Sequence, residues 1–269
     1  MMADACQPEH AAPSCGAIFV ATGEKYVRAG IKAALRINHY SPGLPVHLFT
    51  DEAGRALVGG LDNNPFSSVE VLANPNPRSK VEALGLTPFD RTIYFDTDTA
   101  VVADIREMFD VLDRNDIAMA HAMHRQAGNL IPYRVSLPDA FPELNSGVLL
   151  YKRSPAMDRM LATFKQEFYG DFVSVGAQHG HEKHDQTPLR ELVWLSDLRL
   201  VVLPPEYNIR YIRYPFFWGR DEAVPRIYHL KQLHIGWWPW LSKTIDKWPV
   251  RKQLRIKWKA FKKKVLKIG

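Results

Sequence analysis

Cysteine is scarce in this 269-residue chain, which has only Cys6 and Cys15, both ahead of the first expected strand. Two cysteines so close to the N-terminus cannot build a disulfide framework, so we expect a reduced, cytoplasmic setting. The histidine-rich segment 179–184 has no cysteine nearby, and His181 and His184 are three residues apart rather than the four that a HExxH zinc site needs. We therefore interpret this segment as a polar loop.

Long apolar runs are also lacking, because no stretch approaches the roughly 18 residues that span a bilayer. Residues 1–15 have no basic region followed by an apolar stretch, so we expect no secretory signal. The content of 46% hydrophobic and 24% charged residues excludes disordered and collagen-like classes. We expect an N-terminal extension over 1–15, one domain over 16–242 and a tail over 243–269.

Positive charge is unevenly distributed along the chain. The formal net charge is +6, yet residues 243–269 alone hold eleven Lys or Arg against one acid, Asp246. Within this tail Leu254, Trp258, Phe261, Val265 and Ile268 recur every three or four residues, which predicts a basic amphipathic helix. We expect it to bind an anionic membrane surface at the inner face of the membrane. Nucleic-acid binding, which we do not expect, and a solvated helix are the alternatives.

The order of expected elements predicts an α/β fold. Residues 16–22 form an apolar run typical of a strand buried on both faces, 24–39 have helical periodicity, and 46–50 form a second strand. This βαβ unit predicts a mostly parallel, Rossmann-like sheet flanked by helices. Further elements are expected in the following ranges: strands over 91–95, 116–120, 145–151 and 199–203, and helices over 79–84 and 155–169, the latter capped by Ser154. The long connection 121–143 is typical of a functional loop.

Two carboxylates follow the apolar strand in the segment IYFDTDT. Asp96 and Asp98 flank the small Thr97, where the chain leaves the sheet. Ligands of open α/β sheets bind at the carboxyl ends of the strands, and Mg²⁺ or Mn²⁺ takes carboxylate oxygens together with phosphate oxygens. The pattern therefore indicates a site for a divalent cation and a diphosphate. Two alternatives are that the motif only caps the following turn, or that Asp96 is the nucleophile and Asp98 the acid/base of a phosphatase of the haloacid dehalogenase kind.

Several segments between about Gly16 and Trp240 resemble, in order, the family 8 retaining glycosyltransferases of GT-A fold, which include glycogenin and bacterial lipopolysaccharide galactosyltransferases. The similar segments are ATGEKY, RSKVEAL, TIYFDTDTAVVADIREMF, LNSGVLLYKRS, HDQTPL, LPPEYNIR and RIYHL. The resemblance implies a metal-dependent transfer of a sugar from a nucleotide diphosphate sugar, expected to be a UDP-sugar, to an acceptor hydroxyl. The acceptor would be a glycan or a lipid-linked glycan, and the configuration of the sugar would be retained.

The resemblance also implies roles for individual residues. Asp96, Asp98 and His229 would bind the metal, which we expect to be Mn²⁺ rather than Mg²⁺ because an imidazole joins the carboxylates. Other residues would contact the donor, and three would lie around the transferred sugar as candidate catalytic residues. The donor contacts would be Thr22, Tyr26, Lys80, Asp96, Thr97 and Asp98, and the candidate catalytic residues are Asn145, Asp185 and Gln186.

The segment RIYHLKQLHIGWWPW departs from the His, Gly, Lys, Pro, Trp series of the family. His234 is therefore an alternative third ligand, and Lys231 or Lys243 could replace the missing lysine. The aromatic residues of 211–219 and 237–240 are either core or an acceptor surface. A phosphatase and a non-catalytic, membrane-bound scaffold remain the alternative functions.

Overall fold

A computed structural model describes residues 13–122, 133–170, 185–210 and 225–230. In chain order the elements are β1 (Cys15–Ala21), α1 (Glu24–Tyr40), β2 (Val46–Thr50), α2 (Glu52–Gly59), β3 (Ser68–Val71), α3 (Lys80–Ala83), η1 (Leu84–Leu86), β4 (Arg91–Phe95), β5 (Thr99–Val101), η2 (Arg106–Asp113), β6 (Ile117–His121), β7 (Leu144–Lys152), α4 (Pro155–Tyr169), α6 (Gln186–Leu195), β8 (Leu200–Leu203), η4 (Pro205–Tyr207) and β9 (Ile227–His229).

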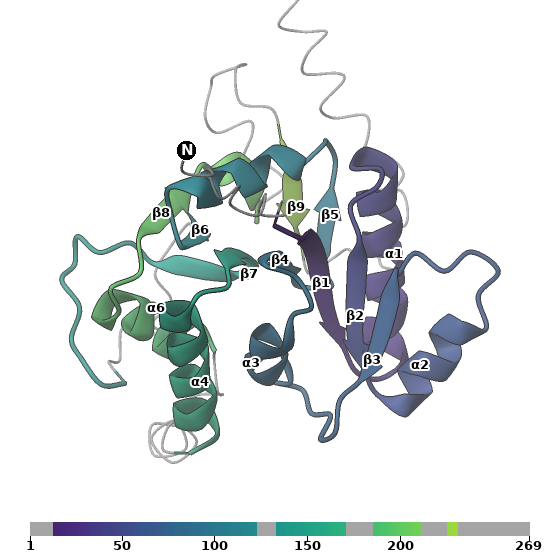
Figure 1. Cartoon of the computed structure of the whole chain (residues 1–269), viewed down its shortest axis with the longest axis horizontal. Helices are drawn as coiled ribbons and strands as arrows, with labels where there is room; N and C mark the ends of the chain where they lie inside the picture. The colour runs from purple at the N-terminus through teal and green to yellow at the C-terminus, as the bar shows by residue number, and fades with distance from the viewer. Residues whose placement is uncertain (1–12, 123–132, 171–184, 211–224, 231–269) are drawn as a thin grey trace, which may run out of the picture.

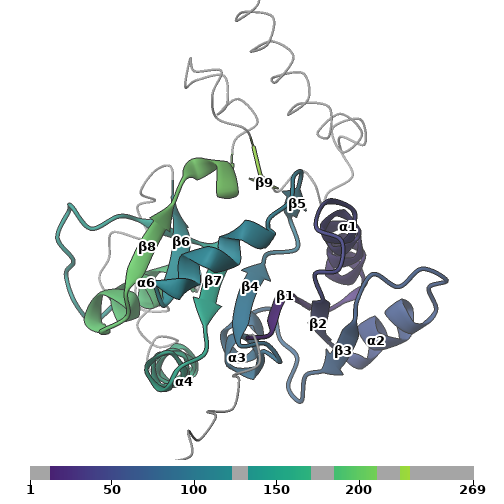
Figure 2. The same ribbon diagram turned by 45° about the horizontal axis from the view of Figure 1, so that its top comes forward.

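Seven strands form one twisted sheet in the order β3-β2-β1-β4-β7-β6-β8 (Figure 1). Neighbouring strands are parallel except at β7, which runs antiparallel to both β4 and β6. The short strands β5 and β9 pair with each other in a separate two-stranded sheet, which Figure 2 shows at one edge of the molecule. The predicted α/β class with a mostly parallel sheet flanked by helices is confirmed.

Helices cover both faces of the sheet. Consecutive residues of β1 point to opposite faces, and both sets are buried. Ala17, Phe19 and Ala21 belong to one core cluster together with α1 and η2, whereas Ile18 packs into a second cluster with α3, α4 and α6. Figure 1 shows α1 beside β2 and β5, and α4 and α6 together near β7. Within the described part of the chain, no helix is both long and apolar enough to cross a membrane.

The antiparallel direction of β7 brings its first residues to the edge where the parallel strands end. Val148 pairs with Phe95 at the end of β4, so residues 144–147 lie beside the segment that follows β4. The pairing with β6 passes from Met119–Leu149 directly to Ala120–Asn145, which leaves residues 146–148 outside that ladder. Bulges of this kind re-aim side chains next to functional sites. Here the bulge puts Ser146 and Gly147 at the end of the sheet where ligands bind.

Most of the expected elements are confirmed with small shifts of their ends. The helix over 155–169 begins as predicted, because the Ser154 hydroxyl accepts a hydrogen bond from the Met157 amide. The elements that were not expected from the sequence include α2, β3, β5, η2, α6, η4 and β9. Other predictions lie outside the described residues: the tail 243–269, the histidine-rich segment 179–184, the aromatic segments 211–219 and 237–240, and His234, Lys231 and Lys243.

Candidate active site

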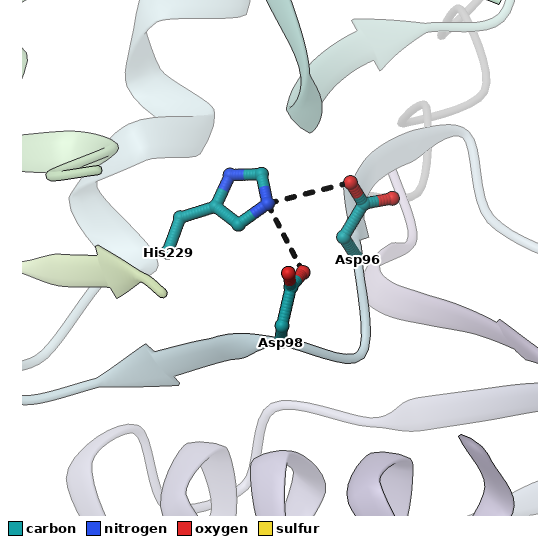
Figure 3. Close-up of side chains that lie close together, drawn as sticks. All are labelled: Asp96, Asp98 and His229. Carbon is teal, nitrogen blue, oxygen red and sulfur yellow. Dashed lines mark ion pairs between the residues drawn. The ribbon is translucent and has the colours of Figure 1, made fainter. Parts of the chain in front are cut away.

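Asp96, Asp98 and His229 come together although they lie far apart in the sequence. Asp96 and Asp98 follow β4, and His229 is the last residue of β9, which pairs with β5 so that Thr99 lies opposite His229. The His229 Nε2 atom is 3.0 Å from Asp98 Oδ1 and 3.5 Å from Asp96 Oδ2. Figure 3 shows the three side chains pointing toward one another. The structure therefore brings His229, the expected third ligand, next to the two carboxylates.

This group of side chains fits a single divalent cation. One ligand atom from each residue lies within 4.8 Å of the others, a separation that an ion with ligand distances of roughly 2.1–2.4 Å can bridge. His229 is buried, whereas Asp96 and Asp98 are partly accessible, so the group has a closed side and an open side. Two carboxylates and one imidazole leave coordination positions for other oxygen ligands.

Close backbone approach makes room for this group. Gly147 lies against His229 and Asp96, and its carbonyl accepts a hydrogen bond from the Asp96 amide at 2.8 Å. A Cβ atom at position 147 would overlap the His229 ring and lie 2.7 Å from Asp96 Oδ2. The glycine of LNSG is therefore required by the geometry of the site, a role that the motif alone does not indicate.

A cavity of about 570 Å³ opens beside the carboxylates. It is lined by Thr22, Tyr26, Lys80, Asp96, Thr97, Asp98 and Asp185, all of which we predicted as site residues. Tyr26 is 50% exposed, so part of its side chain is accessible to a ligand, and Lys25 lies 5.4 Å from the ring centroid. Arg78 and Asn76 also line the cavity and were not predicted.

The turn that carries Thr22 is stabilised by a hydrogen bond to Asp51, which follows the neighbouring strand β2. Asp51, just after β2, accepts hydrogen bonds from the Gly23 amide at 2.7 Å and from the Gly54 amide at 2.7 Å. Gly23 has a φ of 78°, a conformation that glycine adopts without strain. The carboxylate of Asp51 thus links the β1–α1 turn to the start of α2.

Lys80 lines the cavity and lies beside two of its carboxylates. Its ammonium group lies 2.7 Å from Asp185 Oδ2 and 3.6 Å from Asp96 Oδ1, and it donates to the Ser146 carbonyl at 2.8 Å. Burial alone would lower the pKa of Lys80, but the two carboxylates raise it above its ordinary value. Lys80 is therefore a fixed positive charge.

Asp185 is ionised, whereas Tyr94 is protonated. Burial opposes ionisation of Asp185, yet Lys80 and the Ser146 hydroxyl outweigh it and lower the pKa of Asp185 to about 2. Burial, with the negative charge of Asp96, raises the pKa of Tyr94 well above its ordinary value. Tyr94 stays protonated and donates to Asp96 Oδ1 at 2.6 Å. The second oxygen of Asp96 is the one that faces His229.

Asn145 and Gln186 lie behind the cavity rather than among its lining residues. Both are joined in hydrogen bonds: Asn145 Nδ2 donates to Gln186 Oε1 at 3.2 Å, and Gln186 Nε2 donates to Glu143 Oε1 at 2.8 Å. Asn208, which follows η4 in the segment LPPEYNIR, completes this group, and no role for it was predicted from the sequence. Its contacts to Asn145 and His229 could not be inferred from sequence because the residues are 63 and 21 positions apart.

Comparison of the sequence with protein-family models and with curated proteins finds no match. Comparison of the structure finds glycosyltransferases. The glycosyltransferase GlyE of Streptococcus pneumoniae TIGR4 matches over 80% of this chain and 54% of its own, with 18% identity and a TM-score of 0.54. The chain thus spans about half the length of GlyE.

Two further structures match with similar scores over most of their length. The galactosyltransferase LgtC, in complex with donor and acceptor sugar analogs, matches over 80% of this chain and 87% of its own, with 16% identity and a TM-score of 0.55. Mouse xyloside xylosyltransferase 1 matches over 80% and 96%, with 16% identity and a TM-score of 0.50. At these identities the likeness establishes the fold, which is the GT-A fold predicted from the sequence.

Proposed function

We propose that this chain, which has the fold of GT-A glycosyltransferases, transfers a sugar from a nucleotide diphosphate sugar to an acceptor hydroxyl with the help of a divalent cation. The observation that carries the proposal is the Asp96, Asp98 and His229 group, whose two carboxylates line the cavity. It occupies the carboxyl edge of the sheet, where α/β folds bind their ligands.

The charges around the cavity explain why a diphosphate would need the cation. Three positive side chains line it, and three carboxylates offset them: Lys25, Arg78 and Lys80 against Asp96, Asp98 and Asp185. The cavity is thus close to neutral by itself. A diphosphate ester with two negative charges requires added positive charge, and a divalent ion would supply it by stabilising the leaving diphosphate.

The other residues would orient the donor. Tyr26, which lines the cavity and is half exposed, is suited to stack on the nucleotide base, and Thr22 lines the same cavity. Lys80 is a fixed cation within reach of the phosphates or the sugar, and Asp185 beside it is a fixed anion facing the same space. Asn145 and Gln186, whose amides are hydrogen-bonded to each other and to neighbouring residues, would shape the region around the sugar without adding charge.

We further propose that the donor is a UDP-sugar, that the ion is Mn²⁺ and that transfer retains configuration. The resemblance of the sequence segments to family 8 supports these finer statements. The acceptor would be a glycan or lipid-linked glycan, and the basic tail 243–269 would hold the enzyme at an anionic membrane surface. Vesicle sedimentation tests the tail: the full chain should pellet with phosphatidylserine vesicles, and a chain ending at Ser242 should not. Equal pelleting of both would contradict this part.

The experiment that tests the function is a panel of UDP- and GDP-sugars incubated with the full chain and Mn²⁺, with release of free nucleotide as the measurement. We expect one sugar nucleotide to be hydrolysed or transferred. Asp98→Asn should lower this activity by roughly a hundredfold or more, because the leaving charge loses several kcal/mol of stabilisation. Asp62→Asn, which removes an exposed carboxylate before β3, is the matched control and should keep full activity.

The alternatives predict different results in the same assays. A phosphatase would release phosphate from a simple phosphoester and form an intermediate on Asp96, independently of nucleotide sugars. A scaffold would bind neither UDP nor Mn²⁺ in calorimetry. Either result, with an inactive panel, would overturn the transferase proposal.

A further inference from the structure

A chain of hydrogen bonds runs from the metal-binding histidine to the amides behind the cavity. His229 Nδ1 lies 2.9 Å from Asn208 Oδ1, and Asn208 Nδ2 donates to Asn145 Oδ1 at 2.8 Å. The chain continues through Asn145 and Gln186 to the buried carboxylate of Glu143. We call these five residues, from His229 to Glu143, the amide chain.

The direction of every bond in the amide chain is determined by groups that have only one role. The Gly147 amide can only donate, and it donates to Asn145 Oδ1 at 3.1 Å. At the far end the Glu143 carboxylate is held by Arg190, whose NH1 is 3.4 Å from Glu143 Oε2, and it accepts from Gln186. The Gly147 amide therefore shows which side-chain atom of Asn145 is the oxygen, and the Glu143 carboxylate shows which side-chain atom of Gln186 is the nitrogen.

This polarity decides the tautomer of His229. Because Asn145 presents its oxygen, Asn208 must turn its NH₂ toward Asn145 and its oxygen toward His229. An oxygen acceptor at Nδ1 requires that the proton of a neutral imidazole be on Nδ1. The lone pair is then on Nε2, the atom 3.0 Å from Asp98 and 3.5 Å from Asp96. A metal ligand needs this arrangement.

The backbone holds Asn208 and His229 together as well. Ile209, the residue after Asn208, forms a parallel bridge with Tyr228, and the His229 amide donates to the Ile209 carbonyl at 2.8 Å. Asn208 itself is buried, with 4% of its surface exposed, and its backbone amide donates a hydrogen bond to the Pro205 carbonyl. Its side chain therefore has little freedom to leave the amide chain.

We propose that Asn208 is a positioning residue that orients two groups at once: it turns the His229 ring toward the metal, and it holds the Asn145 amide against Gly147 and Gln186, next to the residues that would surround the sugar. This inference rests on the proposed function, since it assumes that His229 binds the metal. Asn208 touches neither ligand and acts through its neighbours. Loss of its oxygen should affect metal binding, and loss of its NH₂ should affect recognition of the sugar.

Two substitutions separate these effects. Asn208→Ala removes both hydrogen bonds. Asn208→Asp keeps an acceptor for His229 Nδ1–H but sets an oxygen against Asn145 Oδ1, so the Asn145 amide must turn or separate. Asn38→Ala, on α1, is the matched control. It also removes a partly buried hydrogen bond of a side-chain amide, here the bond to the Pro65 carbonyl.

The first measurement is binding of Mn²⁺ alone to the full chain. The electron paramagnetic resonance signal of the free ion reports how much Mn²⁺ is unbound, so the measurement does not depend on catalysis. Asn208→Ala should weaken Mn²⁺ binding about 10- to 100-fold, as loss of outer partners of metal ligands does. Asn208→Asp should bind Mn²⁺ within about threefold of the wild type. Asn38→Ala should match the wild type, and thermal unfolding confirms that each variant is folded.

The second measurement compares binding of UDP with binding of the sugar nucleotide that is active in the panel, both with saturating Mn²⁺. Asn208→Asp should bind UDP normally while losing most of the additional affinity for the sugar nucleotide. A purely structural role would weaken both ligands together.

The results distinguish failure of this inference from failure of the proposed function. If the wild type binds Mn²⁺ and Asn208→Ala binds it equally well, Asn208 has no positioning role and the metal site stands. If Asn208→Ala does not fold, weak Mn²⁺ binding by a folded Asn208→Asp protein contradicts the inference, and near-normal binding supports it. If the wild type binds no Mn²⁺, both the metal site and this inference are wrong.

Discussion

Gly147 has no side chain, and its contribution to the site is the space that it leaves. The His229 ring and Asp96 Oδ2 occupy the volume that a Cβ at this position would fill. Its amide also sets the orientation of Asn145 through the hydrogen bond to Asn145 Oδ1. One residue therefore makes room for the proposed metal ligands and determines the direction of the amide chain.

The change Gly147→Ala should consequently abolish metal binding. The added methyl group must displace His229 or Asp96, and a shift of either by about 1 Å breaks a coordination shell that tolerates roughly 0.2 Å. We expect Mn²⁺ affinity to fall at least 100-fold in calorimetry. Gly85→Ala makes the same change in η1, where a Cβ would have no neighbour within 4 Å, and it should bind Mn²⁺ like the wild type. Normal affinity in Gly147→Ala would show that the ligands do not need this space.

Single residues were predictable from sequence where their chemistry is local. Asp96 and Asp98 are two residues apart at the end of an apolar strand, and that spacing alone suggested a shared cation. Asn208 and Gly147 carried no such signal, because their importance comes from residues distant in the sequence that the fold brings to them. A buried amide between two other amides cannot be recognised before its neighbours are known.

Among the elements, one carboxylate just before β6, that of Asp116, bonds to residues at the ends of both neighbouring strands, β7 and β8. Asp116 accepts hydrogen bonds from the Arg199 backbone amide at 2.9 Å and from Arg199 Nε at 3.0 Å, and it lies 3.3 Å from Lys152 Nζ. Arg199 precedes β8, and Lys152 ends β7. The Arg199 guanidinium, followed by the backbone amide and Lys152, holds the pKa of Asp116 well below its usual range.

The substitution Asp116→Asn should therefore destabilise the protein in a pH-dependent way. Since the folded-state pKa is depressed, the stabilisation is fully present above the unfolded pKa of about 3.9 and is lost as pH falls toward the folded value. We expect a loss of about 1–2 kcal/mol in the free energy of unfolding at pH 7, typical of charged hydrogen bonds with partly exposed partners. Urea unfolding at pH 7, 4 and 3 measures it.

The difference between wild type and Asp116→Asn should shrink at pH 3. Asp62→Asn, an exposed change before β3, is the control and should show little effect at any of these pH values. A difference that stays constant from pH 7 to pH 3 would mean that the ionised form of Asp116 has no special role in joining the strands.

Elements were predicted well where periodicity was long enough to be read. Strands β1, β2, β4, β6, β7 and β8 and helices α1 and α4 lie close to their expected ranges. The strands β5 and β9 have three residues each and are stabilised mainly by pairing with one another, so neither range has a recognisable pattern by itself. The antiparallel direction of β7 was also not predicted, since direction depends on how the preceding connection crosses the sheet.

For the whole molecule, metal binding and folding stability should be linked. Asp96 and Asp98 follow one strand and His229 ends another, so the proposed ligands come together only in the folded state. Mn²⁺ at 100 times its dissociation constant should add about 2.7 kcal/mol to the free energy of unfolding. At roughly 2–4 °C per kcal/mol, the melting temperature should rise by about 5–10 °C in a thermal scan.

The variant His229→Ala provides the comparison for this thermal scan. With one ligand missing it should gain little from Mn²⁺, and excess EDTA should return the wild type to its metal-free melting temperature. The variant His39→Ala, on α1 and outside the site, should keep the full increase. Equal increases in His229→Ala and the wild type would place the Mn²⁺ elsewhere on the protein.

The pairing of β5 with β9 also has a consequence for how the protein is made. Arg226, just before β9, bonds to the Asp104 carbonyl 122 residues earlier. At about 5–20 residues per second, a ribosome needs on the order of 10 s to synthesise the intervening chain. During that interval Asp96 and Asp98 exist without His229, beside strands that are already available to pair. The nascent protein would thus acquire its sheet before its metal, and cation capture would be a late event of biosynthesis.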